Sequence, residues 1–396
     1  MESFVEFAPR LSQRISRLKS SLVRDILAAT AKPGVISFAG GLPAADLMPA
    51  LPLAAVSDPA LYQYGTSEGE PAFRKAVAAW VSETGLEIMP DQVLALAGSQ
   101  QGLDFAAKLL IDPGTPMLTE APTYVAALQV FELFGAAIHT VPLAAEGPDL
   151  AALEAQLEHH RPSCIYLIPC FQNPSGACYS AEARSAIAAL LDHYNVTLIE
   201  DEPYRSVALD VDHAMLPICA QLKRANWIYL GSFSKILWPG WRMGYLAASP
   251  ALMPHLVRLK QAADLHTQRP GQHAVASWLQ STGRSADLER LKSGYRIRRD
   301  AMQAALQRHF GELADWEMPR GGLFFWLRLR ALRATRAELD LALAHDIAFM
   351  PGEAFYPQQS DGQQCMRLNY SRATPAEMEV GLARLAGCLK QRAGPA

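Results

Sequence analysis

The segment Gly231–Lys235, with the sequence GSFSK, places a lysine and two hydroxyls at the end of a predicted strand. An ammonium group is costly to bury, and the cost disappears if the amine forms a Schiff base with an aldehyde. Ser232, Ser234 and, seven residues after the lysine, Arg242 offer the short donors and the forked cation that bind a phosphate. The alternative is a surface loop with a solvated lysine. We favour a carbonyl-binding Lys235 beside a phosphate site.

The segment EDEPY, residues 200–204, follows an apolar run at 196–199. An acid at the carboxyl end of a parallel strand lies where α/β proteins bind ligands. A carboxylate in this place can keep a pyridine nitrogen protonated, which makes the ring an electron sink. Tyr204 is placed to form a hydrogen bond with a ring oxygen. Considered alone, however, the segment is more typical of a solvated acidic turn.

Two more segments follow predicted strands. FQNPSG, residues 171–176, contains turn dipeptides, and its Asn173 amide could donate to a ring oxygen of a cofactor. AGSQQG, residues 97–102, joins a strand to a helical stretch, and backbone N–H groups at a helix start bind phosphate without a side-chain charge. It is neither a P-loop nor a GxGxxG motif. Considered alone, the first segment indicates only a turn and the second only an N-cap.

These four segments need a sheet to bring them together. In an open α/β sheet they converge on one edge, where their groups match the needs of pyridoxal 5′-phosphate (PLP). Helical stretches lie between several strands, so we expect an α/β domain with a mostly parallel sheet flanked by helices. The seven expected strands are Val93–Gly98, Met117–Glu120, Ile138–Leu143, Ile165–Pro169, Thr197–Glu200, Trp227–Gly231 and Gly244–Ala248.

The last third of the chain has a different pattern. A strand is expected over Leu323–Leu329, and capping boxes that begin at Thr335 and Thr374 each predict the start of a helix. This combination indicates a smaller α+β domain. We therefore expect a large cofactor-binding domain over residues 46–285 and a small domain formed by residues 1–45 and 286–396.

Composition excludes several classes of protein. The 396 residues carry a formal net charge of -3, so long-range attraction to nucleic acid or an anionic membrane is not expected. No apolar run approaches the ~18 residues of a membrane span, and the first residues lack a signal-peptide pattern. The six cysteines form no CxxC pair, which favours reduced packing residues and a cytoplasmic protein. We expect no metal site.

From residues 21–24 to 367–371 the chain resembles the class I/II aminotransferases of PLP fold type I, closest to the subgroup of the α-aminoadipate and kynurenine aminotransferases. The resemblance implies that Lys235 holds PLP and shuttles a proton, that Asp201 pairs with the pyridine nitrogen, and that Arg367 binds the substrate α-carboxylate. Tyr124 would stack on the ring. The other implied cofactor contacts are Asn173 and Tyr204 at the ring oxygen, and Ser99, Gln100, Ser232, Ser234 and Arg242 at the phosphate.

The resemblance also implies contacts with substrate and with a second subunit. The Gly41 backbone would touch substrate, as would Asn173, and Tyr64 would reach the active site of a partner in a homodimer. Arg24 would contact the substrate side chain and could bind a distal carboxylate, although a solvated helix arginine is an equal alternative. The chain departs from the family pattern at Cys170, which precedes Phe171, and at Glu202, where many relatives have aspartate.

The expected activity transfers the amino group of an α-amino acid, such as 2-aminoadipate, glutamate or an aromatic or branched-chain amino acid, to a 2-oxo acid such as 2-oxoglutarate. One alternative is a PLP-dependent lyase or decarboxylase, which would keep every cofactor residue. A PLP-sensing transcription regulator is disfavoured because the resemblance begins by Ser21 and leaves no room for a winged-helix domain. A scaffold without catalysis is disfavoured by the presence of Lys235, Asp201 and Arg367.

Overall fold

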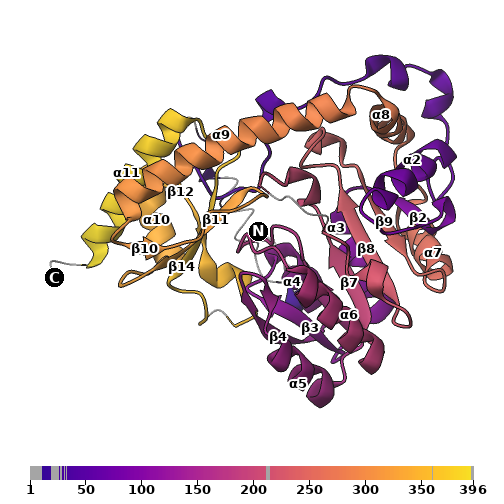
Figure 1. Ribbon diagram of the computed structural model, residues 1–396, viewed down its shortest axis with the longest axis horizontal. Coiled ribbons are helices and arrows are strands. Elements are labelled where there is room, and N and C mark those ends of the chain that lie inside the picture. The colour runs from indigo at the N-terminus through magenta and orange to yellow at the C-terminus, as the bar shows by residue number, and fades with distance from the viewer. Residues whose placement is uncertain are drawn as a thin grey trace, which may run out of the picture.

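The structure is a computed structural model that describes residues 11–18, 26, 29, 30, 32, 34–210, 215–358 and 360–393. Figure 1 shows a larger part built on a wide central sheet and a smaller part built on a second sheet. The long helix α9 (Arg284–Phe310) runs from the first part to the second. The expected α/β fold with a smaller α+β part is confirmed.

The central sheet contains the seven expected strands. Its order is β2-β9-β8-β7-β6-β3-β4-β5, in which β9 pairs antiparallel with both neighbours and the run from β8 to β4 is parallel. The eighth strand, β5, was not expected, because two residues, one of them a proline, give no strand pattern. The strands are β2 Val93–Leu96, β3 Pro116–Ala121, β4 Ala137–Ala144, β5 Gly147–Pro148, β6 Cys164–Leu167, β7 Thr197–Asp201, β8 Trp227–Ser232 and β9 Gly244–Ala248.

Helices cover both faces of this sheet. On β2, Leu94 and Leu96 belong to one apolar cluster, and Val93 and Ala95 belong to the other, as the alternation of side chains along a strand requires. The first cluster includes helices α3, α4 and α7, and the second includes α2, α5, α6 and α8. These helices are α2 Pro71–Ser82, α3 Ser99–Leu110, α4 Val125–Phe134, α5 Leu150–His160, α6 Ala181–Tyr194, α7 Met253–Asp264 and α8 Arg269–Gln280.

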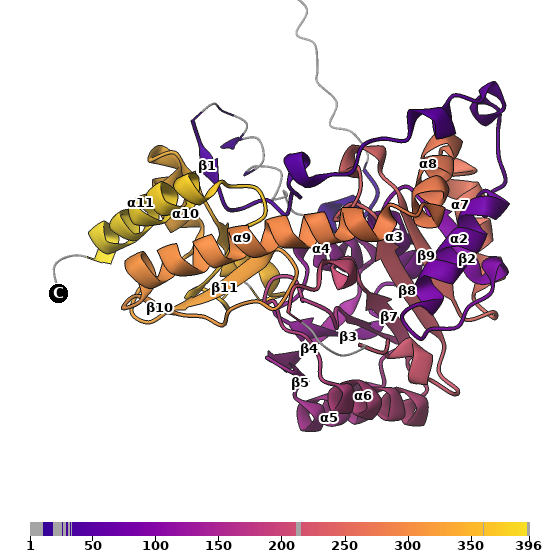
Figure 2. The same cartoon turned by 45° about the horizontal axis from the view of Figure 1, so that its top comes forward.

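The smaller part holds an antiparallel sheet of order β10-β11-β14-β13. Both expected capping boxes form, at Thr335 and at Thr374, and they start helices α10 (Arg336–Ala344) and α11 (Pro375–Ala393). Near the amino terminus, strand β1 (Ile36–Ser37) pairs with β12 (Ile347–Ala348), so segments from opposite ends of the chain lie side by side. Figure 2 shows α9 and α11 packed along the four-stranded antiparallel sheet. The strands of this antiparallel sheet are β10 Ala314–Asp315, β11 Phe324–Leu329, β13 Met350–Pro351 and β14 Cys365–Asn369.

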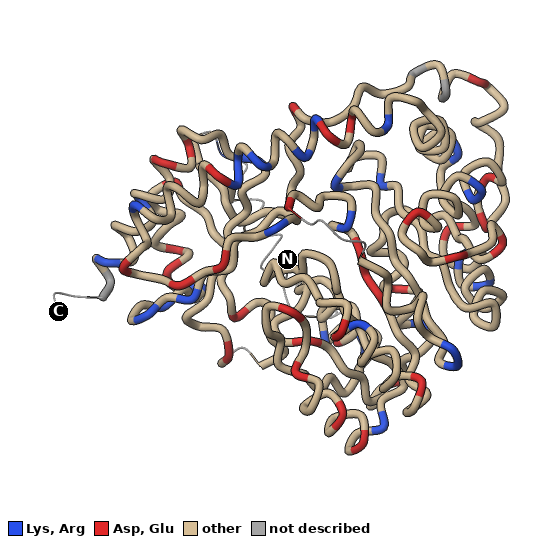
Figure 3. The backbone as a smooth tube through the Cα atoms, viewed as in Figure 1, with Lys and Arg blue, Asp and Glu red and all other residues tan. Residues whose placement is uncertain are grey.

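Within the described part of the chain, no helix combines the length and the hydrophobicity needed to cross a lipid bilayer. Figure 3 shows that lysine and arginine are interspersed with aspartate and glutamate over both parts of the molecule. The six cysteines are all buried, and none forms a disulfide.

Candidate active site

A cavity lies where strands β6, β7 and β8 reach their carboxyl ends. All ten residues expected to contact the cofactor line it, although they come from segments spread between residues 99 and 242. The convergence follows from topology, because parallel strands place their carboxyl ends at one edge of the sheet. The lining residues are Ser99, Gln100, Tyr124, Asn173, Asp201, Tyr204, Ser232, Ser234, Lys235 and Arg242, together with Ile168 and Pro203, which were not expected.

Lys235 is a partly buried lysine in this cavity and is not a solvated surface residue. Its Nζ atom donates to the Gly41 carbonyl oxygen at 3.0 Å and lies 5.8 Å from the centre of the Tyr204 ring. Burial, together with the positive charges of Arg367 and Arg242, lowers its pKa to about 8. A neutral amine is therefore accessible near physiological pH, which a nucleophile or a base requires.

Asp201 presents one carboxylate oxygen with an unsatisfied hydrogen-bonding capacity. Its Oδ2 atom accepts a hydrogen bond from the Tyr166 hydroxyl at 2.7 Å, while Oδ1 is buried and has no partner among the described residues. Burial raises the pKa of Asp201 to about 7, and the nearby charge of Glu202 acts in the same direction. A cationic N–H group placed at Oδ1 would complete the bonding and stabilise the ionised carboxylate.

The two neighbouring glutamates have a different role. Because side chains alternate along a strand, Glu200 and Glu202 point away from the face that carries Asp201. Glu200 accepts hydrogen bonds from the backbone N–H groups of residues 218 and 219, and Glu202 forms ion pairs with Arg205 and, at 3.5 Å, Arg184. All three acids are buried, so the interpretation of this segment as a solvated turn is wrong, and only Asp201 faces the cavity.

Groups suited to a phosphate gather at the start of α3. Gly98, with φ +84°, precedes Ser99, the first residue of that helix, and a side chain at position 98 would collide with the Arg242 guanidinium. Arg242 donates to the Ser234 hydroxyl at 3.4 Å, and the Ser234 backbone N–H donates to the Ser232 hydroxyl at 3.2 Å. A helix N-terminus, serine hydroxyls and an arginine together form an anion site.

Arg367, on β14, is a buried cation with no acidic partner in the described part of the chain. It donates to Asn173 Oδ1 at 2.7 Å and to the Ala39 carbonyl, whereas its Nε has no partner among the described residues. The rings of Phe324 and Phe355 lie 4.1 and 5.1 Å from the guanidinium carbon. Burial lowers its pKa only to about 10, so it stays cationic at neutral pH.

The comparisons with known proteins agree with this geometry. The sequence model of aminotransferase class I and II matches residues 34–385. This chain belongs to the class I and II aminotransferases. It is 38% identical to the 2-aminoadipate transaminase of Thermus thermophilus, over 94% of this chain and 95% of that protein, and 33% identical to the aromatic-amino-acid aminotransferase 1 of Thermococcus litoralis, over 98% and 95%.

A solved structure extends the match to three dimensions. The crystal structure of α-aminoadipate aminotransferase from Thermus thermophilus, complexed with N-(5′-phosphopyridoxyl)-L-leucine, has a TM-score of 0.86 and 34% identity, and covers 96% of this chain and 97% of that one. The fold is therefore PLP fold type I, and the enzyme is a PLP-dependent aminotransferase. The cavity of this aminotransferase fits that cofactor. The free Asp201 Oδ1 suits a protonated pyridine nitrogen, and Lys235 suits the aldehyde. The residues at the start of α3 and around it, which we call the α3 cradle (Ser99, Gln100, Ser232, Ser234 and Arg242), suit the phosphate.

Three further residues expected at the site lie around it or outside the described structure. The backbone of Gly41 reaches the cavity through its contact with Lys235. Tyr64 does not line the cavity of its own chain; it is 76% exposed and contacts only the edge of the His266 ring among the aromatic residues described. Arg24 lies outside the described residues.

Sequence reasoning missed the residues that hold the functional side chains of the aminotransferase in place. Tyr166 lies within the apolar strand β6. The available signal was its hydroxyl, because a buried tyrosine hydroxyl needs a hydrogen-bond partner, which here is Asp201. Phe324 and Phe355, which flank Arg367, look like ordinary core residues in sequence and lie on separate elements. The proximity of Phe324 to the arginine depends on the pairing of β11 with β14 and is not a local property.

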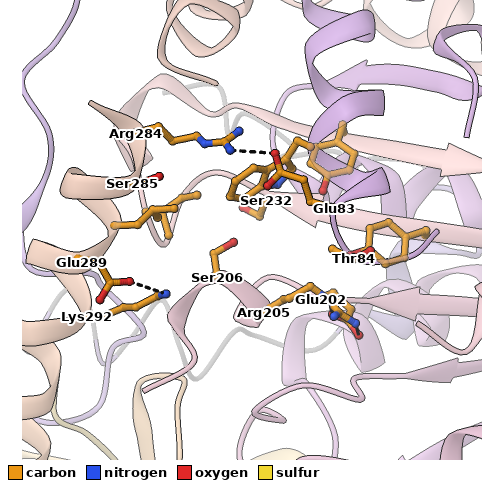
Figure 4. A pocket seen from close by; sticks show the side chains of 15 residues that line it. Glu83, Thr84, Glu202, Arg205, Ser206, Ser232, Arg284, Ser285, Glu289 and Lys292 are labelled. Carbon is orange, nitrogen blue, oxygen red and sulfur yellow. Dashed lines mark hydrogen bonds and ion pairs between the residues drawn. The ribbon is translucent and has the colours of Figure 1, made fainter. Parts of the chain in front are cut away.

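A second cavity shares Ser232 with the first. Figure 4 shows that its charged groups are matched: Arg284 pairs with Glu83 at 2.8 Å and Lys292 with Glu289 at 3.0 Å. Arg205, which also lines it, is paired with Glu202. Because its cations are already neutralised, this cavity is a poorer anion site than the cavity that contains Arg242.

The pH dependence of cofactor capture follows from the state of Lys235. Only the neutral amine attacks an aldehyde, and the pKa of Lys235 in the cofactor-free protein is about 8. The rate at which added PLP develops its visible absorption band should therefore rise about tenfold per pH unit below pH 8 and level off above it. Stopped-flow absorbance between pH 6 and 10 measures this rate. A midpoint near the ordinary lysine value would contradict the environment described for Lys235.

Proposed function

We propose that this aminotransferase moves the amino group of 2-aminoadipate, glutamate, or an aromatic or branched-chain amino acid to a 2-oxo acid such as 2-oxoglutarate. The observation that carries the proposal is that three groups meet at a single site. They are the Lys235 amine with its lowered pKa, the Asp201 carboxylate with one oxygen free of hydrogen bonds, and Arg367, which has no acidic partner among the described residues. The relatives named for aminoadipate and for aromatic amino acids support this range of donors. Within the proposal, Arg24 contacts the distal carboxylate of acidic donors.

The residues divide the chemistry among them. PLP supplies an aldehyde for the amino group and a cationic ring that withdraws electrons. Lys235 Nζ would take the proton from the substrate α-carbon and pass it on within the same half of the cycle, and in the second half it would move a proton in the opposite direction, onto the α-carbon. Asp201 would keep the pyridine nitrogen protonated, and Arg367 would bind the α-carboxylate of the substrate. Removal of the α-proton is favoured because the lowered pKa of Lys235, about 8, leaves part of the amine neutral near physiological pH.

The remaining cavity residues fix the cofactor. Burial raises the pKa of Tyr204, so its phenol stays protonated and can donate to the ring oxygen together with the Asn173 amide. The Tyr124 ring, which lines the cavity, would stack on the pyridine. The α3 cradle, formed by Ser99, Gln100, Ser232, Ser234 and Arg242, would hold the phosphate.

An absorbance titration tests the function. The purified holoenzyme is mixed with L-glutamate, L-2-aminoadipate, leucine and phenylalanine in turn. We expect the visible PLP band to convert to the pyridoxamine band and to return when 2-oxoglutarate is added, with the conversion rates ranking the donors. A visible band that persists while the amino acid is consumed would show instead that the enzyme is a lyase or decarboxylase. Failure of the returning step with every 2-oxo acid tested would contradict transamination.

Arg367 provides a prediction about substrate recognition. Lysine at this position keeps the charge but loses the planar fork and the bond to Asn173. We expect Arg367→Lys to lower kcat/KM for every amino donor by about 100-fold, mainly through KM, because the bidentate pairing with the α-carboxylate is lost. Steady-state kinetics with two donors measures the effect, while PLP binding should be unchanged. An effect confined to acidic donors would show that a residue other than Arg367 binds the α-carboxylate.

The enzyme is proposed to act as a homodimer in which Tyr64 completes the partner's site. Tyr64 follows the 3-10 helix η4 (Pro59–Tyr62), whose position is fixed by Arg269, which donates to the carbonyls of Ala60 and Gln63 at 2.6 and 3.3 Å. Its large exposed ring lies outside its own cavity, as a residue that enters a second subunit requires.

Subunit mixing tests this arrangement. Neither Tyr64→Ala nor Lys235→Ala dimers should transaminate well, but a hybrid dimer has one site with both residues intact if Tyr64 crosses the interface. Refolding an equal mixture should therefore restore up to about one quarter of wild-type activity. If Tyr64 serves its own subunit, both hybrid sites are damaged and no activity returns.

The proposal also covers domains and location. A large domain of residues 46–285 and a small domain of residues 1–45 and 286–396 are supported by the pairing of β1 with β12, which ties residues 36–37 to the carboxyl-terminal part. A cytoplasmic location is supported by the six buried cysteines without disulfides, as reducing compartments favour.

A further inference from the structure

Glu120, at the end of β3, is a wholly buried carboxylate that has no cationic partner among the described residues. Four groups donate to it instead. They are the Ile168 backbone N–H at 3.3 Å, the Gln172 amide at 2.8 Å, the Thr123 hydroxyl at 3.4 Å and the Tyr179 hydroxyl. An uncompensated buried carboxylate is costly, and burial raises the pKa of Glu120 to about 7.

Two of the four donors to Glu120 come from the turns that carry cofactor contacts. Thr123 immediately precedes Tyr124, and Gln172 immediately precedes Asn173. The Gln172 amide also donates to the Pro122 carbonyl at 2.7 Å, so it bridges the two turns directly. The same residue accepts hydrogen bonds from the backbone N–H and the hydroxyl of Ser175, at 2.8 and 2.7 Å, which fixes the second turn.

The contacts of Glu120 suit an ionised acid. A carboxylate only accepts hydrogen bonds, so both of its oxygens can satisfy all four donors together. A glutamine of the same shape would place an NH₂ group against at least one N–H or O–H donor. The contacts therefore explain why an acid, and not an amide, occupies this buried position.

We propose that Glu120 is a positioning residue that locks the turn carrying Tyr124 to the turn carrying Asn173 and so sets the two sides of the cofactor cavity. This inference rests on the roles proposed above for Tyr124 and Asn173. Because Asn173 also accepts a hydrogen bond from Arg367 at 2.7 Å, the same lock orients the proposed carboxylate-binding arginine. Glu120 does not line the cavity itself and acts only through its neighbours.

The test measures PLP binding to the cofactor-free protein by quenching of tryptophan fluorescence, alongside KM for the amino donor. Glu120→Gln should weaken PLP binding about tenfold, because a buried donor is left unsatisfied and the turns shift. It should also raise KM, since Asn173 and Arg367 move together. The matched control is Asp192→Asn, which alters a carboxylate that ties residues 223–225 far from the cavity. This control should lower the melting temperature and leave PLP binding within about twofold of wild type.

A double-mutant cycle with Gln172→Met decides whether the link runs through the turns. The effects of the two single substitutions on PLP binding should be strongly non-additive in the double variant, because both substitutions remove the same interaction, the one between Glu120 and the Gln172 amide. Additive effects, or a Glu120→Gln protein that binds PLP within about twofold of wild type, would overturn the proposal.

Two further comparisons keep the test decisive. If Glu120→Gln does not fold, Gln172→Met is compared with Tyr179→Phe, which removes a donor to Glu120 from outside both turns. Only the first should weaken PLP binding, and equal effects would count against the lock. The wild-type conversion of the PLP band to the pyridoxamine band reports separately on the proposed function, so failure of that function is distinguishable from failure of this inference.

Discussion

Replacing Lys235 with alanine is expected to lower transamination by at least about 10³-fold, since the proposed base at the α-carbon is lost. The protein should still fold, because the Lys235 side chain forms one hydrogen bond, to the Gly41 carbonyl, in the described structure. The visible band of bound PLP should be lost as well. Absorbance spectra and single-turnover kinetics with L-glutamate measure the two effects.

A second buried lysine serves as the control for this experiment. Lys260 is fully buried in α7, where it donates to Asp264 and to Thr267 at 2.9 and 2.7 Å. Lys260→Met should lower the melting temperature but keep the visible band, because its amine does not line the cavity. Loss of the band in Lys260→Met with retention in Lys235→Ala would reverse the assignment of the cofactor lysine.

Replacing Asp201 with asparagine is expected to reduce kcat by about 10²- to 10³-fold, because the ring nitrogen loses the charge that keeps it protonated. The amide is nearly isosteric, so PLP should still bind and give a visible band. Stopped-flow measurement of the first half-reaction isolates the loss in proton removal. Equal rates for Asp201→Asn and wild type would mean that the free Oδ1 atom does not face the cofactor nitrogen.

Tyr166 gives a graded version of the same test. Its hydroxyl bonds Asp201 Oδ2 and stabilises the ionised carboxylate, so Tyr166→Phe should raise the pKa of Asp201 and reduce kcat by about five- to tenfold. The loss should grow as the pH falls, since a larger fraction of Asp201 is then protonated. Tyr229, a buried tyrosine that lines the second cavity, is the matched position, and Tyr229→Phe should leave this pH profile unchanged.

Much of the fold could be predicted from the sequence because the relevant signals are local. Short apolar runs bounded by glycine, proline and acidic turns marked seven strands of the central sheet, and side chains at Thr335 and Thr374 marked two helix starts. Once the strands were known to be parallel, the clustering of the motifs that follow them was a geometric consequence. The eighth strand, β5, has only two residues and carries no local signal.

The same locality limited what could be predicted about the site. Sequence reasoning alone treats Glu200, Asp201 and Glu202 as equivalent carboxylates, and only the resemblance to a family distinguished Asp201. In the structure the distinction is physical, because alternation along β7 turns Asp201 toward the cavity and the two glutamates toward buried donors and cations.

The chemical groups of the enzyme, and the order in which they follow the strands along the chain, are properties that can be read from the sequence without coordinates. Their surroundings come from the folded molecule: the Gly41 carbonyl beside Lys235, 194 residues away, and the contacts between Arg367 and both Asn173 and Phe324. The Glu120 lock, which joins turns 50 residues apart, is of the same kind. Such contacts depend on strand register and on the packing of the two sheets, which arise from interactions along the whole chain.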